Sequence, residues 1–369
     1  MSYSLKETLK QAGVQCYLLR AAPDGEGDWS QEGETTLVQI IRRKGLFTET
    51  WIERMCQDIA RRPLPFLVDV GGKPQPWQEG IFAECTHAIL LTKDADTHAF
   101  WRALVTKYNL TLIADLHSEW EGEAQLAQET PHIIGTITHL RRHRPAQGVV
   151  FDTLIQRLKQ LLPDDYETVL ADHQIMRPVE TVIDIPTLHR AIKPTHSEVW
   201  WQPQDLLAVL NQLPQIALGF YGNGPIWLYA TVACHIFPEP FYLFDARLGW
   251  LKTITLNQGQ GSPFVVTFKH GDAFIFINIS INQGYLTYTP NMVADLPEPL
   301  EANGVILGGK LPNWLFTSLA LYYQTAAWVA IYYPHTNEAV IVVSQFKRGP
   351  WAIGQTIDLT GSEALIVTV

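Results

Sequence analysis

The sequence has few cysteines and no excess of positive charge, and each shortage excludes a class of protein. Its four cysteines are scattered along 369 residues without a CxxC pair, so neither a disulfide framework nor a zinc site is indicated. The formal net charge is −10, whereas a charge-driven binder of long nucleic acids needs a basic face. A small nucleotide that binds specifically is not excluded.

Long apolar runs are also missing. No stretch approaches the roughly 20 apolar residues that a membrane span needs, and the N-terminal MSYSLKETLKQAG lacks an apolar core of signal-peptide length. We therefore predict a soluble, cytoplasmic protein with no membrane partner. With 47% hydrophobic residues, the chain can bury substantial cores, and its length predicts two or three domains.

Residues 16–150 alternate short apolar segments with amphipathic helical stretches. The apolar segments include CYLLRA, PFLVDV, HAILLT and LTLIADL. Continuous apolar strands separated by helices are typical of a parallel, doubly wound α/β sheet. We predict an N-terminal α/β domain over residues 1–164, followed by a linker within PDDYETVLADHQIMRP.

The C-terminal half contains one motif twice, as GNGPIWL and as GGKLPNWL. In each copy a glycine loop is followed by a proline, a Trp-Leu pair, an apolar helix and an apolar strand. Pro225 and Pro312 are 87 residues apart, a spacing that suits a small domain duplicated in tandem and is too long for a solenoid unit. We predict two further α/β domains, over residues 178–260 and 262–369.

The repeated motif has two interpretations. Gly222 and Gly224 let the backbone approach a ligand closely, and Pro225 suits the first position of the following helix. A helix N-terminus after such a loop favours anions, including phosphates. The same pattern is typical of an ordinary strand-to-helix turn in which Trp227 and Trp314 are core anchors, and the pattern alone favours this turn because glycine turns greatly outnumber phosphate-binding loops.

The strand PFYLFD ends in Asp245, and Arg247 follows it. Ligands bind at the carboxyl ends of strands in open α/β sheets. Asp245 could hold a divalent metal there, and Arg247 could pair with a phosphate. The alternative is an Asp-Arg pair in a surface turn.

The segments GNGPIWL and FDARLG together resemble the small, manganese-dependent ring nuclease family of type III CRISPR systems. Its members carry a G-V-x-I-S-G-R-x-P-x-W-L segment and a Y-D-P-R-L-G segment, and NGVILGGKLPNWL is similar to the first of these. The resemblance implies a dimer of a domain distantly like the CARF or Rossmann-type nucleotide sensors. It also implies binding and cleavage of cyclic tetra-adenylate.

Some members of that family are fused to an AAA-type P-loop domain. The blocks RAAPDGEGDWSQEG, PFLVDVGGKPQP, CTHAILLT, LHSEWEG and GTITHLRR resemble successive parts of it, which implies a P-loop-like sheet in the N-terminal domain. No G-x-x-x-x-G-K-[ST] occurs, and the chain begins at what resembles the helix after that loop. We expect neither ATP as a cofactor nor ATP hydrolysis by this chain alone.

Two places in this domain have side chains that can bind a metal. Asp69 stands at the Walker-B position, where we favour a structural role because no phosphate site accompanies it. His117, Glu119 and Glu121 follow a predicted strand, and a capping or packing role there is as plausible as metal binding.

Carried over from the family, the catalytic candidates are Asp245, Arg247 and His235, with Asp245 also the metal ligand for Mn²⁺ or Mg²⁺. The family's S-G-R triplet reads Tyr221-Gly222-Asn223 in the first copy. In the second copy Tyr333, His335 and Gln324 replace its Asp, Arg and His. The ligand-binding candidates are the loop residues Gly222, Asn223, Gly224, Gly308, Gly309 and Lys310.

We therefore expect a type III CRISPR accessory protein that binds a cyclic oligoadenylate, with cyclic tetra-adenylate as the first candidate and cleavage weak or lost. A duplication makes the two copies a pseudo-dimer within one chain, so each copy is free to lose half of a symmetric site. One alternative is an active ring nuclease. The other is a non-catalytic assembly subunit, and the expected protein partner is a P-loop protein or a second copy of this chain.

Overall fold

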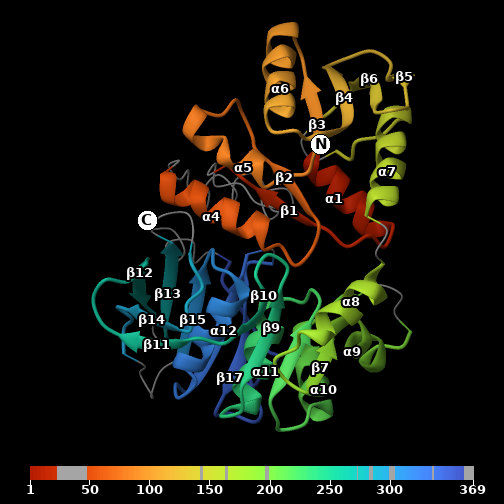
Figure 1. Cartoon of the computed structure of the whole chain (residues 1–369). Coiled ribbons are helices and arrows are strands. Elements are labelled where there is room, and N and C mark those ends of the chain that lie inside the picture. Colours follow the sequence, from red (N-terminus) through yellow and green to blue (C-terminus); the bar gives the residue numbers. More distant parts are fainter. Residues whose placement is uncertain are drawn as a thin grey trace. The chain divides into compact units, whose positions relative to one another are not determined.

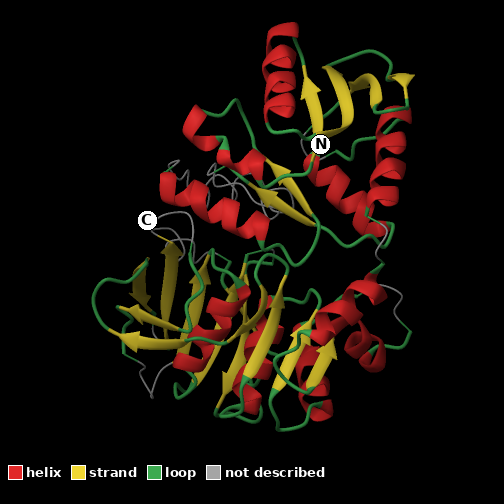
Figure 2. Cartoon of the chain, in the orientation of Figure 1, coloured by secondary structure: helices red, strands yellow, loops and turns green. Residues whose placement is uncertain are grey.

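The computed structural model describes residues 1–22, 48–141, 144–162, 165–195, 199–271, 273–281, 286–298, 304–334 and 336–360. Most of the block RAAPDGEGDWSQEG therefore lies outside the described residues. The chain is a mixed α/β protein with several parallel or mixed sheets, which confirms the expected class at that level (Figures 1 and 2). The P-loop-like and CARF-like architectures and the domain boundaries stay predictions.

The chain separates into two compact units. Of the described residues, those within 1–22, 48–173 and 246–248 belong to the first unit, and those within 174–245 and 249–360 belong to the second.

The first unit contains a sheet whose described strands run in the order β3-β4-β6-β5, with β5 antiparallel to its neighbour, and a separate parallel pair, β1 and β2. Its strands are β1 (Tyr17–Arg20), β2 (Phe66–Asp69), β3 (His87–Thr92), β4 (Thr111–Glu119), β5 (Gln125–Gln128) and β6 (Ile133–Thr138). Its helices are α1 (Ser2–Gln11), α4 (Glu49–Ala60), the 3-10 helix η1 (Pro76–Gln78), α5 (Gly80–Ala83), α6 (Ala95–Lys107), α7 (Val149–Leu161) and α8 (Tyr166–Ile175).

Helix α7 supplies much of the core of this unit. Its buried residues recur at the spacing of one helical face, which packs on β4, β5 and β6 and against α1. They are Val150, Phe151, Leu154, Ile155 and Leu158. The sheet side of the same core comes from inward-facing residues of β4 and β6, such as Leu116 and Ile133.

The stretch predicted as a linker contains a helix, α8. Val169 and His173 lie one turn apart on it and are both buried. The Nε2 atom of His173 lies 2.9 Å from the carbonyl oxygen of Pro63, so this part of the chain packs on the first unit as ordered structure.

The second unit begins with a small sheet in the order β10-β9-β8-β7, in which β7, β8 and β9 are parallel and β10 is antiparallel to β9. Its strands are β7 (Thr181–Asp184), β8 (Leu218–Tyr221), β9 (Phe241–Asp245) and β10 (Gly249–Lys252). Its helices are α9 (Ile185–Ile192), the 3-10 helix η2 (Pro203–Asp205), α10 (Leu206–Gln212) and α11 (Ile226–Ile236).

The rest of the unit forms a sheet in which the described strands run β12-β13-β15-β16-β17-β18, beside a parallel pair, β11 and β14. Strands β13, β15 and β16 are parallel and β17 is antiparallel to β16, which is the arrangement of β7 to β10. The elements are β11 (Thr255–Gln258), β12 (Phe264–His270), β13 (Phe274–Ile281), β14 (Asn291–Ala294), β15 (Gly304–Gly309), α12 (Asn313–Tyr322), β16 (Trp328–Tyr333), β17 (Glu338–Ser344) and β18 (Thr356–Asp358).

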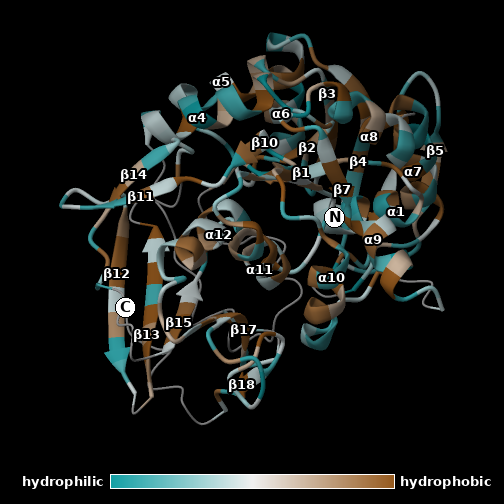
Figure 3. Ribbon diagram, turned by 90° about the horizontal axis from the view of Figure 1, so that it is seen from below, coloured by the Kyte–Doolittle hydropathy of each residue, from teal (hydrophilic) through white to brown (hydrophobic). Residues whose placement is uncertain are grey.

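Each copy of the repeated motif places one apolar helix between two parallel strands. Helix α11 connects β8 to β9, α12 connects β15 to β16, and the two helices pack against each other. Helix α11 also contacts β9 of its own sheet and β16 and β17 of the other. Most of both helices is buried, and their apolar character can be followed in Figure 3.

We predict that Leu154→Ala destabilises the first unit by about 2–5 kcal/mol, because Leu154 is fully buried and its truncation leaves a cavity in the core. Leu161→Ala is the matched control in the same helix, since Leu161 is 41% exposed, and should change stability by about 0.5 kcal/mol or less. Urea denaturation followed by circular dichroism measures both. Equal losses would contradict the described packing of α7.

Candidate functional site

The carboxyl ends of β7, β8 and β9 lie at one edge of the first-copy sheet, because these strands are parallel. Asp184 ends β7 and pairs in register with Tyr221 at the end of β8. Asp245 ends β9 and is partly buried. The loop of residues 222–224 leaves β8 at the same edge, so the structure brings it together with Asp245.

The glycines of this loop have structural reasons to be there. Gly222 has φ of 98°, in the left-handed region that favours glycine. A Cβ at position 224 would lie 3.1 Å from Leu228 Cδ2 and 3.4 Å from Ile185 Cδ1, so Gly224 allows α9 and α11 to approach the loop. Asn223 lies between them and is exposed.

Tyr229 in the first turns of α11 is a site residue that the motif did not reveal. Its hydroxyl donates to the carbonyl oxygen of Gly222 at 2.6 Å and accepts from the Gly224 amide at 3.0 Å. The N–H of Gly224 is therefore directed at this buried hydroxyl and is not presented to a ligand. Comparison of the two copies could have marked Tyr229, since Phe316 stands at the same place in the second.

The sequence suggested that Pro225 is the first residue of the following helix, but it lies one position before that helix. It is the N-cap residue of α11, with extended backbone angles, and the helix begins at Ile226. Pro312 has the same place before α12. Trp227 and Trp314 are 3% and 0% exposed, so the interpretation of these two tryptophans as core anchors is confirmed.

Arg247 already faces a carboxylate. It belongs to Ala246–Leu248, a segment of the first unit, and its Nε lies 3.5 Å from Oδ2 of the buried Asp58. A phosphate at Arg247 would have to compete with this ion pair.

His235 lies at the opposite edge of the sheet from Asp245. Helix α11 starts beside the loop at the carboxyl end of β8, and its 11 residues carry the chain back to the amino end of β9, a length of about 16 Å. The His235 ring contacts Gln215 there, with Nε2 atoms 2.6 Å apart, and partial burial lowers the pKa of its imidazole. The structure thus does not bring His235 together with Asp245 in the first copy.

Strand register aligns the two copies residue by residue. Asp184 pairs with Tyr221, and Asn278 pairs with Gly308 at the equivalent place, so Asn278 replaces Asp184. At the end of β9, Asp245 pairs with Gly249 of β10. At the equivalent end of β16, Tyr333 pairs with Glu338 of β17, so Tyr333 replaces Asp245. The carboxylates at the ends of β7 and β9 therefore have no counterpart at the ends of β13 and β16.

The glycine candidates of the second copy lie within a strand, whereas those of the first copy lie in the loop after β8. Gly308 and Gly309 are the last residues of β15, and Lys310 follows and is exposed. A Cβ at Gly308 would lie 2.7 Å from the Phe276 ring, so the close approach of β13 and β15 requires this glycine. Gln324 follows the end of α12, and His335 lies outside the described residues.

The donor set at the first-copy edge does not fit a resident Mn²⁺ or Mg²⁺ held by the protein. The described residues contain no group of three or more His, Cys, Asp or Glu side chains that could hold a metal ion. Asp184 accepts hydrogen bonds from the Thr187 amide at 2.9 Å and the Thr187 hydroxyl at 2.5 Å as the N-cap of α9. Asp245 stands at the same edge, at the end of β9, and a cation held there would take most of its oxygen ligands from water or substrate phosphates.

In the first unit, Asp69, which the sequence suggested as a Walker-B carboxylate, binds protein groups. Asp69 Oδ2 accepts from Arg20 Nη1 at 2.7 Å and from the Ser2 hydroxyl at 2.6 Å, and Oδ1 accepts from the Gly71 amide at 3.1 Å. These contacts tie β1, β2 and α1 together. The other candidates in this unit, His117, Glu119 and Glu121, are all exposed, and His117 Nε2 lies 3.6 Å from Glu119 Oε1.

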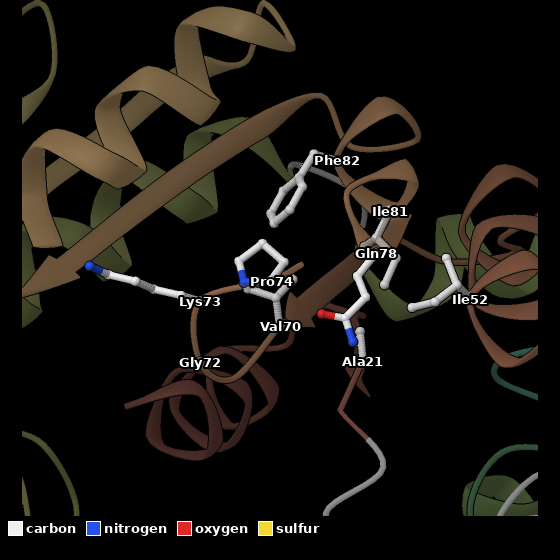
Figure 4. A pocket seen from close by; sticks show the side chains of 9 residues that line it. All are labelled: Ala21, Ile52, Val70, Gly72, Lys73, Pro74, Gln78, Ile81 and Phe82. Carbon is white, nitrogen blue, oxygen red and sulfur yellow. The ribbon is translucent and has the colours of Figure 1, made fainter. Parts of the chain in front are cut away.

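A small pocket lies beyond the carboxyl ends of β1 and β2 (Figure 4). Its wall is mainly apolar and includes Val70, Ile81 and Phe82. Lys73 points away from that wall in Figure 4, and its ammonium lies 5.1 Å from the Phe100 ring centroid. The cavity volume of about 90 Å³ is too small for a nucleotide, since small-molecule sites usually span about 300–1,000 Å³.

No described helix is both long and apolar enough to cross a membrane.

Residues 283–358 match a family described as CRISPR-associated protein (Cas_csx3). The match covers about a fifth of the chain and contains β15, α12, β16 and β17, that is, the second copy of the repeated motif. No curated protein matches the chain. The match supports a CRISPR association for this protein.

We predict that Gly309→Ala severely destabilises the second unit. The φ of 128° at this position disfavours a side chain, and the Cβ would lie 2.0 Å from the backbone oxygen of Ile279, which cannot move without breaking the pairing of β13 with β15. Gly261→Ala is the matched control, with φ of 89° but open space around the Cβ, and should lose about 1–2 kcal/mol from the backbone alone. Thermal denaturation compares them, and equal melting temperatures would show that the clash is absent.

Proposed function

We propose that this protein is an accessory protein of type III CRISPR systems that binds a cyclic oligoadenylate, with cyclic tetra-adenylate as the first candidate, and that cleavage of this ligand is weak or lost. The CRISPR association comes from the match over residues 283–358. The observation that carries the rest is the register of the two copies. It gives each copy a loop-bearing strand edge, with carboxylates at the ends of β7 and β9 in the first copy and none at the ends of β13 and β16 in the second.

The second-copy edge is the better place for a phosphodiester. Asn278 and Tyr333 stand where the first copy has Asp184 and Asp245, so a bound phosphate meets no carboxylate from these two strand ends, and the carboxylate at this edge is Glu338 at the start of β17. Lys310 follows β15 directly, is exposed, and stands where the first copy has Asn223. Lysine provides a compact positive charge that pairs with phosphate.

Cleavage has weaker support than binding. Metal-assisted phosphodiester cleavage requires a firmly held cation or a well-placed base. Asp184, the other carboxylate at the described ends of β7 to β9, is engaged as the N-cap of α9. His235 lies at the opposite edge of the same sheet. These separations favour a protein that retains the messenger over one that degrades it.

We predict that Lys310→Ala weakens retention of radiolabelled cyclic tetra-adenylate on a native gel about tenfold, which corresponds to about 1.4 kcal/mol for one charge-assisted contact. Lys347→Ala is the control, because Lys347 is an exposed lysine of the same unit beyond β17. It should change retention by less than about twofold. Equal effects of the two substitutions would mean that the second-copy edge is not the binding place.

We predict that the wild-type protein gives little or no cleavage product from cyclic tetra-adenylate, with or without Mn²⁺, on a denaturing gel. Asp245→Asn should retain the ligand equally well or better, because it removes a negative charge at the first-copy edge. Products that disappear in Asp245→Asn would instead support an active ring nuclease. Neither retention nor products at micromolar protein would reject both functions, and copurification with a P-loop protein would then favour an assembly subunit.

A further inference from the structure

One hydroxyl closes the first-copy loop onto the helix that follows it. Tyr229 Oη donates to Gly222 O at 2.6 Å and accepts from Gly224 N at 3.0 Å, and the side chain is 2% exposed. The two bonds fix both ends of the three-residue loop, and the exposed Asn223 lies between them.

These bonds decide which polar groups the loop presents. A carbonyl oxygen is a hydrogen-bond acceptor with partial negative charge, so it repels a phosphate. The hydroxyl of Tyr229 binds the carbonyl of Gly222 and the amide of Gly224 and thereby holds both toward the helix, so the exposed Asn223 is the residue that the loop presents to a ligand. The left-handed backbone at Gly222, with φ of 98°, makes this orientation possible.

The hydroxyl keeps its proton. Burial raises the pKa of Tyr229, the hydrogen bond from Gly224 lowers it, and the charge of the nearby Asp245 raises it again, with a net shift upward. The group therefore remains a donor to Gly222 at neutral pH.

The second copy shows that packing of the helix does not require this hydroxyl. Aligned on Pro225 and Pro312, Tyr229 corresponds to Phe316, which is 4% exposed on α12. An aromatic ring is thus buried at this place in both copies. The second copy holds Gly309 in another way, by pairing with Ile279 of β13. The hydroxyl of Tyr229 serves the loop and not the helix.

We infer that Tyr229 is a positioning residue, whose hydroxyl preorganises residues 222–224 for a phosphodiester ligand. A loop held in one conformation before binding loses less conformational entropy when the ligand arrives. This inference rests on the proposed function and adds to it that the first copy contributes to binding through a preformed loop.

The test compares Tyr229→Phe with Tyr323→Phe in the full-length protein. Tyr323 is also fully buried, and its hydroxyl donates to Pro297 O at 2.9 Å, so each variant removes a buried hydroxyl and keeps the ring. We expect similar decreases of a few degrees in melting temperature. In Tyr229→Phe alone, exchange of the Gly224 amide hydrogen should accelerate at least about tenfold, and retention of cyclic tetra-adenylate should weaken about tenfold.

The two readouts separate the inference from the function on which it rests. If the wild type retains the ligand and Tyr229→Phe retains it equally well, the inference is wrong and the function stands. If the wild type does not retain the ligand, the proposed function fails. Amide exchange then decides, and a Gly224 amide that is unprotected in the wild type or unchanged in Tyr229→Phe overturns the positioning role. The wild-type measurement tests the positioning role even if a variant folds poorly, because it needs only the wild-type protein.

Discussion

The second unit depends on the burial of two helices that are apolar on nearly every side. Eight residues of α11 and seven consecutive residues of α12 are buried, and a helix of this kind is stable only when protein surrounds it. Helix α11 packs against α12, against its own β9 and against β16 and β17 of the other copy. Each copy therefore buries part of the other's helix, which is a physical reason for the two to occur in one chain.

The same helices determine what the site can do. A crossover helix that starts at the carboxyl edge of one parallel strand must return to the amino edge of the next. Asp245 and His235 lie at the two ends of this path, so the fold separates them by about the length of α11. With two strand edges in one chain, the second could exchange its carboxylates for Asn278 and Tyr333 without loss of the shared helical core.

Sequence reasoning reached the features that depend on local pattern. The repeat, the α/β alternation and the two buried tryptophans follow from apolar periodicity and spacing, and the structure contains each of them. It missed Tyr229 because a single tyrosine in an apolar helix is indistinguishable from core until its hydroxyl partner is known. It also treated α8 as a linker, because His173 finds its partner, Pro63, more than 100 residues away.

The sequence by itself determined that one motif occurs twice and that the charged ending with Asp245 and Arg247 belongs to the first copy. Those are properties of residue order. The tertiary structure decided which groups meet, namely Tyr229 with the loop glycines and Asp69 with Arg20. It also decided which do not, since His235 and Asp245 lie at opposite edges. The physical reason is that strand register and helix direction convert distance along the chain into distance in space, and neither is encoded in one residue.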